Sequence, residues 1–266
     1  MNYEGVLTKM QSEFQNPIQY FLIFKNDFIH MNQLIGASIK IDWMGEQCLS
    51  CGFHRDIFRQ GFCKSCFFEK PIAGEWILKP ELSQAHLNIE DRDLEFEKEM
   101  QLQPHIVYLA NSSNLKVGVT RKKQIPTRWI DQGAHEALEI LETPNRYLAG
   151  ISEVALKEHV SDKTNWRSML KNDVKDVDLP KVRDELKRYI PDEVESYFLP
   201  ERTELHLHFP VQKYPNKPRS LNLKKDRKFS GKLVGIKGQY LIFDDDTVFN
   251  VRSNEGTIVN LSLVPV

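Results

Sequence analysis

The sequence predicts an α+β protein, and three observations lead to this class. Both ends of the chain alternate polar and apolar side chains, as half-buried strands do. The middle switches between strand-like and helix-like periods, with Pro126 early in a helical stretch and Gly133 at its end. Four cysteines lie close together, between positions 48 and 66. With 266 residues, 41% of them hydrophobic, the chain is long enough for two compact domains or one large domain with insertions.

The expected elements follow one another in four stretches. Residues 1–47 contain the strand-like QYFLIF and ASIKIDW, and residues 48–80 hold the cysteines. Residues 104–170 read as strand, hairpin, helix with TRWIDQG, strand with EALEILET and helix with RYLAGISEVALKEHV. Residues 201–266 are again β-like, with LHLHF, QYLIF and TIVNLSLV. Between the second and third stretches, NIEDRDLEFEKEMQLQ is spaced like a strand but composed like a helix, and both remain open.

The two ends of the chain resemble each other and indicate an internal repeat. Matching features occur in the same order: EGVLTKM with SGKLVGI, Gln19-Tyr20 with Gln239-Tyr240, and Gly36 with Gly256. The spacing between the tyrosine and the glycine is the same in both copies. We infer that residues 1–47 and 201–266 pair in one small β-barrel or sandwich, with the other stretches inserted between them. The alternative is chance similarity between two β-meanders.

The cysteines form two C-x-x-C pairs, Cys48 with Cys51 and Cys63 with Cys66, which a short segment separates. Each pair can offer two thiolates to adjacent corners of a tetrahedron, so the spacing predicts a structural zinc knuckle without an open position for water. The alternatives are a redox dithiol and four unrelated buried cysteines. His54 is a possible substitute ligand, although a fifth ligand is unnecessary.

Reduced, metal-binding thiols predict a cytoplasmic protein. The first residues have no cationic start followed by an apolar run, so we expect no secretory signal. The longest apolar runs, such as YFLIF, are far too short to cross a bilayer, so we expect no membrane association. The formal net charge of −1 decides nothing, because phosphate binding depends on local charge.

Two basic segments suit a nucleic-acid backbone. The first carries five cations and no acid between Lys116 and Arg128: Lys116, Arg121, Lys122, Lys123 and Arg128. The second, between Lys213 and Lys228, includes Lys224, Lys225, Arg227 and Lys228 beside an aromatic and two prolines, and is expected to be extended. The alternatives are a solvated edge strand for the first segment and a solvated loop for the second.

Glu153 belongs to a helix whose expected apolar face carries Leu148, Ile151 and Ala155 with Val154. The face of Glu153 itself carries Arg146, Gly150 and Lys157. From spacing alone, an exposed i, i+4 pair between Glu153 and Lys157 is the favoured interpretation.

Residues 104–170 resemble the core of the GIY-YIG nucleases, on Val107-Tyr108-Leu109, Lys116-Val117-Gly118-Val119-Thr120, Arg128 and Glu153, which occur in the family's order. The resemblance is closest to phage-type members. It implies that Tyr108 and Arg128 organise the scissile phosphate and that Glu153 holds a divalent metal, Mg²⁺ or Mn²⁺. It also implies a downstream asparagine, for which Asn165 is the candidate.

One departure from that family matters. The second motif's tyrosine, which helps to activate water, is replaced by Lys116, which could hold a phosphate, act as a base, or mark lost catalysis. His135 is a spare general base by sequence position. The whole chain is also similar to an uncharacterised bacterial family known only as a domain of unknown function, on Lys116–Arg121, Arg128–Ala134 and Gly235–Leu241. That resemblance implies no activity.

These observations predict a GIY-YIG-like core and a zinc knuckle inserted in a β-rich domain made from both chain ends. The leading functional hypothesis is a nucleic-acid processing enzyme that hydrolyses phosphodiesters of DNA or RNA with a catalytic metal. The main alternative is a non-catalytic zinc-containing DNA- or RNA-binding module with a degenerate nuclease scaffold. A purely structural adaptor would leave both basic segments unexplained.

Overall fold

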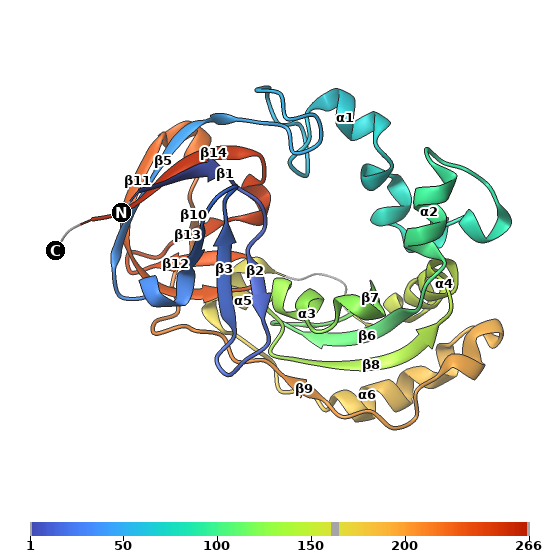
Figure 1. Ribbon diagram of the computed structural model, residues 1–266. Helices are drawn as coiled ribbons and strands as arrows, with labels where there is room; N and C mark the ends of the chain where they lie inside the picture. Colours follow the sequence, from blue (N-terminus) through green and yellow to red (C-terminus); the bar gives the residue numbers. More distant parts are fainter. Residues whose placement is uncertain (1, 161–164, 265–266) are drawn as a thin grey trace.

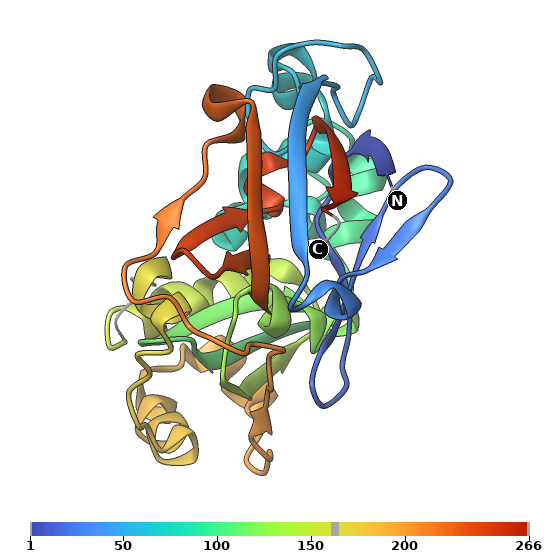
Figure 2. The same cartoon turned by 90° about the vertical axis from the view of Figure 1, so that its left-hand side faces the viewer.

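The structure, a computed structural model, describes residues 2–160 and 165–264. A 7-stranded sheet joins the two ends of the chain in the order β1-β14-β5-β11-β12-β13-β10. The bounds of its strands are β1 (Asn2–Val6), β5 (Ser38–Glu46), β10 (Arg219–Ser220), β11 (Lys228–Lys237), β12 (Tyr240–Phe243), β13 (Thr247–Asn250) and β14 (Thr257–Leu263). We name this part, with the small sheet described next, the β-domain (Figure 1). Figure 2 shows the long β5 and β11 side by side, with the cysteine segment above them and the central sheet below.

The β-domain contains two copies of the same succession of elements. A 3-stranded sheet of β2 (Gln11–Glu13), β3 (Gln19–Ile23) and β4 (Phe28–His30) is followed by the 3₁₀ turn η1 (Met31–Leu34) and β5. In the C-terminal copy, β12 and β13 are followed by the 3₁₀ turn η9 (Arg252–Asn254) and β14. The order strand, strand, 3₁₀ turn, strand is therefore the same in both copies.

The strand registers obey the same correspondence. β5 and β14 pair antiparallel, and Ile41 lies opposite Leu261, its counterpart when the two Gln-Tyr pairs are aligned. On either side of this ladder, matching residues form matching pairs: Gly5 with Val259 and Gly231 with Ile39. Because each pair occupies the equivalent place in its ladder, the two copies are related by an approximate two-fold axis through the β5–β14 ladder.

The central sheet has four strands in the order β7-β6-β8-β9 and packs on both faces. Its strands are β6 (His105–Asn111), β7 (Leu115–Arg121), β8 (Glu136–Thr143) and β9 (Leu205–His206). The helices in this part of the chain are α3 (Thr127–Asp131), α4 (Arg146–Lys157), α5 (Trp166–Lys171), which packs on the β-domain, and α6 (Leu179–Leu186). Along β6 the period of 2 divides the side chains. Ile106 and Tyr108 enter the core shared with the β-domain, whereas Val107 and Leu109 pack with residues of α4 and α6. The expected mixed α+β class is confirmed.

The acidic stretch that was open between strand and helix forms the helix α2 (Leu94–Gln101). Asp93 caps it by accepting a hydrogen bond from the Phe96 N–H at 3.0 Å. The buried Glu97 carboxylate accepts three more, from the N–H groups of residues 91, 92 and 93. These local acceptors satisfy backbone donors at the helix start, which explains why composition outweighed the strand-like spacing.

A linker of short turns joins the cysteines to α2. After α1 (Lys64–Glu69) come η2 (Pro71–Ala73), η3 (Glu75–Ile77), η4 (Pro80–Leu82) and η5 (Ala85–Leu87). The turn η4 packs directly on α4, where a side chain at Gly150 would collide with the backbone of Pro80 and Glu81. The cysteine segment is thus fastened to the central sheet as well as to β5.

This packing corrects the expected orientation of α4. Its buried residues are Ala149, Gly150, Ser152, Glu153 and Leu156, and Val154 is 44% exposed. The prediction that Val154 lies on the apolar face was wrong, because α4 is covered on two sides, by the sheet and by η4. In the described part of the chain, no helix is long and apolar enough to cross a membrane.

Candidate functional site

The four cysteines converge on one point. Cys48 and Cys51 follow β5, Cys63 is the residue immediately before α1, and Cys66 lies in the first turn of that helix. All four sulfur atoms lie within 4.8 Å of one another, and the Cys63 N–H donates to Cys48 Sγ at 3.3 Å. We name this group the cysteine cluster; it could hold a metal ion such as zinc. His54 is exposed and is not part of it.

The chemistry of the cluster fits a cation. Burial opposes ionisation of Cys48, but hydrogen bonds from the N–H groups of Cys51, Cys63 and Ser50 outweigh it and lower the thiol pKa to about 6. Burial and the neighbouring sulfurs raise the pKa of Cys66 to about 11. Further thiols ionise beside a thiolate only when a positive charge offsets them, and a tetrahedral Zn²⁺ with four sulfur ligands supplies that charge.

A second candidate site lies against the central sheet. Four side chains that the sequence singled out line one cavity of about 640 Å³, which we name the site cavity: Tyr108, Lys116, Arg128 and Glu153. The first two come from the hairpin β6–β7, and the others come from α3 and α4. In Figure 1, α3 lies toward the β-domain and α4 lies beneath α2. A hairpin and two separate helices therefore meet at one hollow.

The hairpin register determines which side chains face the cavity. Tyr108 lies opposite Gly118, and Lys116 lies opposite Ala110, so all four positions are on one face of the sheet. A Cβ atom at Gly118 would approach the Tyr108 hydroxyl to 2.6 Å, so the glycine leaves the room that this phenol occupies. Gln132 Nε2 donates to the hydroxyl at 2.7 Å. Burial raises the pKa of Tyr108, so the phenol stays protonated and has a hydrogen to donate.

Glu153 is both paired and directed into the site cavity. Lys157 lies 3.1 Å from its Oε1, as the i, i+4 spacing predicts, but the pair is not an exposed one, because Glu153 is only 8% exposed. Burial raises the pKa of Glu153, while the charges of Lys157 and Arg146 counteract this effect. A buried carboxylate beside cations is a group whose charge a bound metal ion would stabilise.

Arg146 and the linker complete the walls, and sequence reasoning gave neither of them a role. Arg146 donates to the backbone oxygens of Trp76 at 3.2 Å and Ile77 at 2.8 Å, which brings the linker onto the cavity. Burial lowers the pKa of Arg146 to about 10. A signal was available, because Arg146 lies two turns before Glu153 on the same helix face. The linker residues Ile77, Leu78 and Pro80 also line the cavity, and no sequence signal pointed to them.

Two other candidates lie elsewhere. Asn165 caps α5 by accepting a hydrogen bond from the Arg167 N–H at 3.0 Å, and it does not line the site cavity. The helix that it begins packs on the β-domain instead, where Trp166 stacks on Tyr240. His135, the spare base, contacts Asn172 and Lys237 and also lies outside the cavity.

The cations of the first basic segment lie in different environments. Arg121 ends β7 and donates to Met100 Sδ at 3.1 Å, at the wall of a larger hollow next to the site cavity. Lys122 pairs with Glu142 at 2.8 Å, and Lys123 is exposed. The positive charge of this segment that faces the two hollows is thus concentrated at Arg121, Arg128 and Lys116.

The second basic segment lies within the β-domain. It is not simply extended, since it includes β10 and the short helix α7 (Leu223–Asp226). Lys224 pairs with Glu46 at 2.9 Å and with Asp56 at 3.5 Å, so carboxylates offset its charge. The Arg227 guanidinium lies 3.9 Å from the centroid of the Trp43 ring. Lys225 and Lys228 are exposed, and none of these four cations lines the site cavity.

Comparisons with known proteins give one match. Neither the curated proteins nor the solved structures contain a match to this chain. A family match covers residues 36–259, which takes in the second copy of the repeat nearly to its end, the cysteine cluster and all the walls of the site cavity. The chain belongs to this family, which is described as a protein of unknown function (DUF2797).

Proposed function

We propose that this protein processes nucleic acid by metal-dependent hydrolysis of a phosphodiester at the site cavity. The observation that carries the proposal is the convergence of Tyr108, Lys116, Arg128 and Glu153 on one hollow. The resemblance to GIY-YIG nucleases assigns phosphate binding to Tyr108 and Arg128 and metal binding to Glu153, while Lys116 occupies the place of the second motif's tyrosine. The site cavity also contains Arg146, which adds a second guanidinium near the carboxylate.

The residues have distinct roles in this proposal. Arg128 and Lys116 neutralise the phosphate, the former with two parallel donors and the latter as a compact charge. Tyr108 orients the attacking water through its hydroxyl, because its raised pKa favours a hydrogen-bond donor over a base. Asn165 has no role, since it lies outside the cavity.

Glu153 would hold Mg²⁺ or Mn²⁺. Among the described residues, no group of three or more carboxylate, histidine or cysteine ligands includes Glu153. A single carboxylate is sufficient for Mg²⁺, which keeps several waters and takes its remaining oxygens from substrate phosphate. The bound metal would polarise the phosphoryl oxygen and lower the pKa of a water.

The cysteine cluster has a structural role in this proposal. Four thiolates close the coordination sphere of Zn²⁺, so no position remains for a reacting water. The metal instead holds the cysteine segment, which connects β5 to the linker. Ile77, Leu78 and Pro80 of that linker line the site cavity. Reduced thiols and a closed zinc site are consistent with a cytoplasmic protein.

The test is a cleavage assay with labelled single-stranded DNA, duplex DNA and RNA in Mg²⁺, Mn²⁺ or EDTA. We expect metal-dependent cutting by the wild type and a loss on the order of 10²-fold or more in Glu153→Gln. The matched control is Glu158→Gln, which changes an exposed carboxylate at the end of the same helix. Thermal melting of both variants shows that they are folded.

Salt-sensitive binding without cutting, in every metal, would instead assign the chain to the non-catalytic DNA- or RNA-binding modules. In that case Lys116 marks the loss of the water-activating group. Equal cutting by wild type and Glu153→Gln would contradict the proposed metal ligand.

A further inference from the structure

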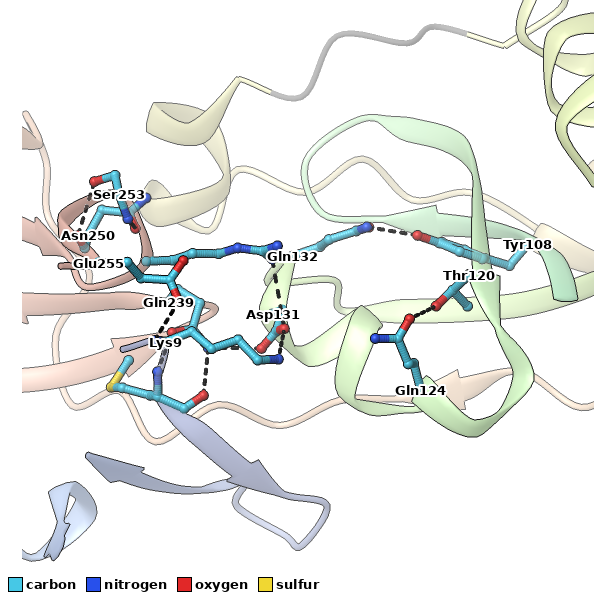
Figure 3. Close-up of polar contacts among 12 residues, drawn as sticks. Lys9, Tyr108, Thr120, Gln124, Asp131, Gln132, Gln239, Asn250, Ser253 and Glu255 are labelled. Carbon is cyan, nitrogen blue, oxygen red and sulfur yellow. Dashed lines mark hydrogen bonds and ion pairs between the residues drawn. The ribbon is translucent and has the colours of Figure 1, made fainter. Parts of the chain in front are cut away.

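A second hollow, of about 870 Å³, lies where the cysteine segment, the linker, the central sheet and the β-domain meet. We name it the arginine cleft, because four arginines line it: Arg121, Arg128, Arg146 and Arg252. Figure 3 shows polar side chains of the β-domain, around Gln239, and of the central part, around Asp131 and Tyr108, approaching each other here. The cleft is thus assembled from segments far apart in the chain.

The arginine cleft adjoins the site cavity. Ile77, Leu78, Val119, Arg128 and Arg146 line both hollows. A chain that places one phosphate in the site cavity can therefore continue past the two shared arginines into the cleft without leaving the protein surface.

Charge is distributed unevenly along the cleft. At the β-domain end, Asp131 accepts hydrogen bonds from Lys9 Nζ and Gln239 Nε2, both at 2.8 Å, and Glu255 accepts one from the Lys9 N–H at 2.9 Å. Both acids are therefore already bound by the protein, and Asp131 also lies 3.9 Å from the Arg252 guanidinium. At the other end, no ion pair within 4.0 Å involves Arg121, Arg128 or Arg146 in the described part of the chain. Three partly buried guanidinium groups, none of them with a carboxylate at ion-pair distance among the described residues, match an anionic ligand.

Apolar side chains occupy the walls between the charges. Ile72 and Leu78 line the cleft and are 48% and 71% exposed, and Leu78 also lines the site cavity. Exposed apolar side chains suit the faces of unpaired bases, which they contact without regard to sequence. The volume is that of a small-ligand pocket, which a few nucleotides fill and a turn of double helix cannot enter.

We propose that the arginine cleft binds the single-stranded segment that adjoins the phosphodiester held in the site cavity. Arg121 and Arg252 contact phosphates of this segment, and Leu78 separates its bases from the reacting phosphate. The proposal rests on the proposed function for the position of that phosphodiester, but it concerns binding and is tested without turnover.

The test measures the fluorescence anisotropy of labelled short single-stranded DNA and RNA and of a blunt duplex of the same sequence, all in EDTA. The variant Arg121→Gln removes a cleft arginine outside the site cavity. We expect it to weaken single-strand binding about tenfold and to reduce the log–log salt slope by about 0.7. The control Arg202→Gln removes an arginine paired with Glu139 away from both hollows and leaves affinity unchanged within about twofold.

A second pair of variants keeps the test valid if Arg121→Gln misfolds. Leu78→Asp adds a negative charge at an exposed position that lines both hollows, and Leu87→Asp adds it at a position that is 58% exposed outside both hollows. We expect only the first of these variants to weaken single-strand binding. Both substitutions are on the surface, so their melting temperatures should stay close to the wild type.

Three results would overturn the proposal: equal affinity for duplex and single strand, unchanged single-strand binding in both cleft variants, and competition by free mononucleotides at the same phosphate concentration as the oligonucleotide. The last would identify a nucleotide pocket. Because the assay contains no metal, cleft-dependent binding without Glu153-dependent cutting would refute only the hydrolysis. Cutting without cleft-dependent binding would refute only the cleft.

Discussion

The two copies of the β-domain repeat share a backbone but differ in what surrounds them. In the N-terminal copy the turn η1 is local, and Asn32 of this turn bonds back to the strand through the Ile18 oxygen at 2.9 Å and the Tyr20 N–H at 2.8 Å. In the C-terminal copy the equivalent turn η9 presents Arg252 and Ser253 to the arginine cleft. Both turns make local hydrogen bonds, since the Ser253 N–H donates to Asn250 Oδ1 at 2.9 Å, but only the C-terminal turn also lines the proposed ligand site.

The two glycines at the ends of these turns show the same contrast. The Gly36 N–H donates to the Leu233 oxygen at 2.7 Å, and the Gly256 N–H donates to the Leu7 oxygen at 2.9 Å, so the hydrogen bonds are equivalent. A side chain at Gly36 would meet nothing within 4 Å, whereas one at Gly256 would meet Ile57 of the cysteine segment at 2.8 Å. Equivalent backbone positions thus experience different tertiary surroundings, which makes the copies controls for each other.

The largest expected effect comes from removing the metal ion proposed for the cysteine cluster. Structural zinc contributes on the order of 10–16 kcal/mol of apparent binding free energy in small domains. Chelation, or Cys63→Ser, should release the segment that covers Gly256 and raise deuterium uptake at its amide. Uptake at the Gly36 amide should stay near the wild type. Equal increases at both amides would show that the metal supports the whole β-domain, and elemental analysis without any bound metal would refute the zinc prediction.

The next effect concerns Lys237, which is fully buried in the C-terminal copy. The matching position in the N-terminal copy, directly after EGVLTKM, is Gln11, and this residue is exposed. The Lys237 ammonium donates to the Met169 oxygen and Asn172 Oδ1 at 3.0 Å and lies 3.0 Å from His135 Nε2. Burial lowers the pKa of Lys237 to about 7, while the unfolded chain keeps a lysine pKa of about 10.4. Between these values the unfolded state binds more protons, so unfolding free energy should rise with pH.

We expect a slope approaching about 1.4 kcal/mol per pH unit in denaturant titrations between pH 7 and 10. Lys237→Met should remove most of this slope, and Gln11→Met serves as the control in the other copy. The His135 pKa, lowered to about 4 by burial and the Lys237 charge, makes stability fall separately as pH drops from 6.5 toward 4. A flat profile above pH 7 in the wild type would contradict the assignment.

Substituting the two glycines separates backbone strain from packing. Both have φ values in the left-handed region, +97° for Gly36 and +85° for Gly256. Alanine in that region costs about 1–2 kcal/mol, which is the whole effect expected for Gly36→Ala. Gly256→Ala should cost about 1–3 kcal/mol more, because Ile57 and the Gln47 oxygen must shift. Chemical denaturation measures both unfolding free energies. Equal losses in the two variants would mean that the cysteine segment moves away from the added methyl group without an energetic cost.

The smallest effect is expected for Arg252, which we compare with Asn32, its counterpart in the N-terminal copy. Asn32→Ala should lower stability by about 1–3 kcal/mol, because it leaves backbone groups without partners, and should leave single-strand binding unchanged. Arg252→Ala should change stability by no more than about 0.5 kcal/mol and weaken single-strand binding by a few fold, with a smaller salt slope. If Arg252→Ala destabilises the fold as much as Asn32→Ala does, both turns are structural.

The cysteine cluster was the part of the site that the sequence could predict. Cys48, Cys51, Cys63 and Cys66 are close in the sequence, and C-x-x-C spacing restricts each pair to a short turn, so local geometry determines most of the cluster. The site cavity needed more than spacing. The order of Tyr108, Lys116, Arg128 and Glu153 pointed to these residues, but their meeting depends on a three-strand register and two helix packings.

The sequence by itself determined the α+β class, the strand and helix periods, the four-sulfur cluster and the repeat, because each is encoded in neighbouring residues or in two matching segments. Only the tertiary structure decided that Arg146 lines the cavity of Glu153, that Leu78 of the linker walls it, and that Asn165 lies elsewhere. It also decided that Lys237 is buried while Gln11 is exposed. These outcomes depend on which surfaces pack together across long separations, and that choice is made by the free energy of the whole core rather than by local pattern.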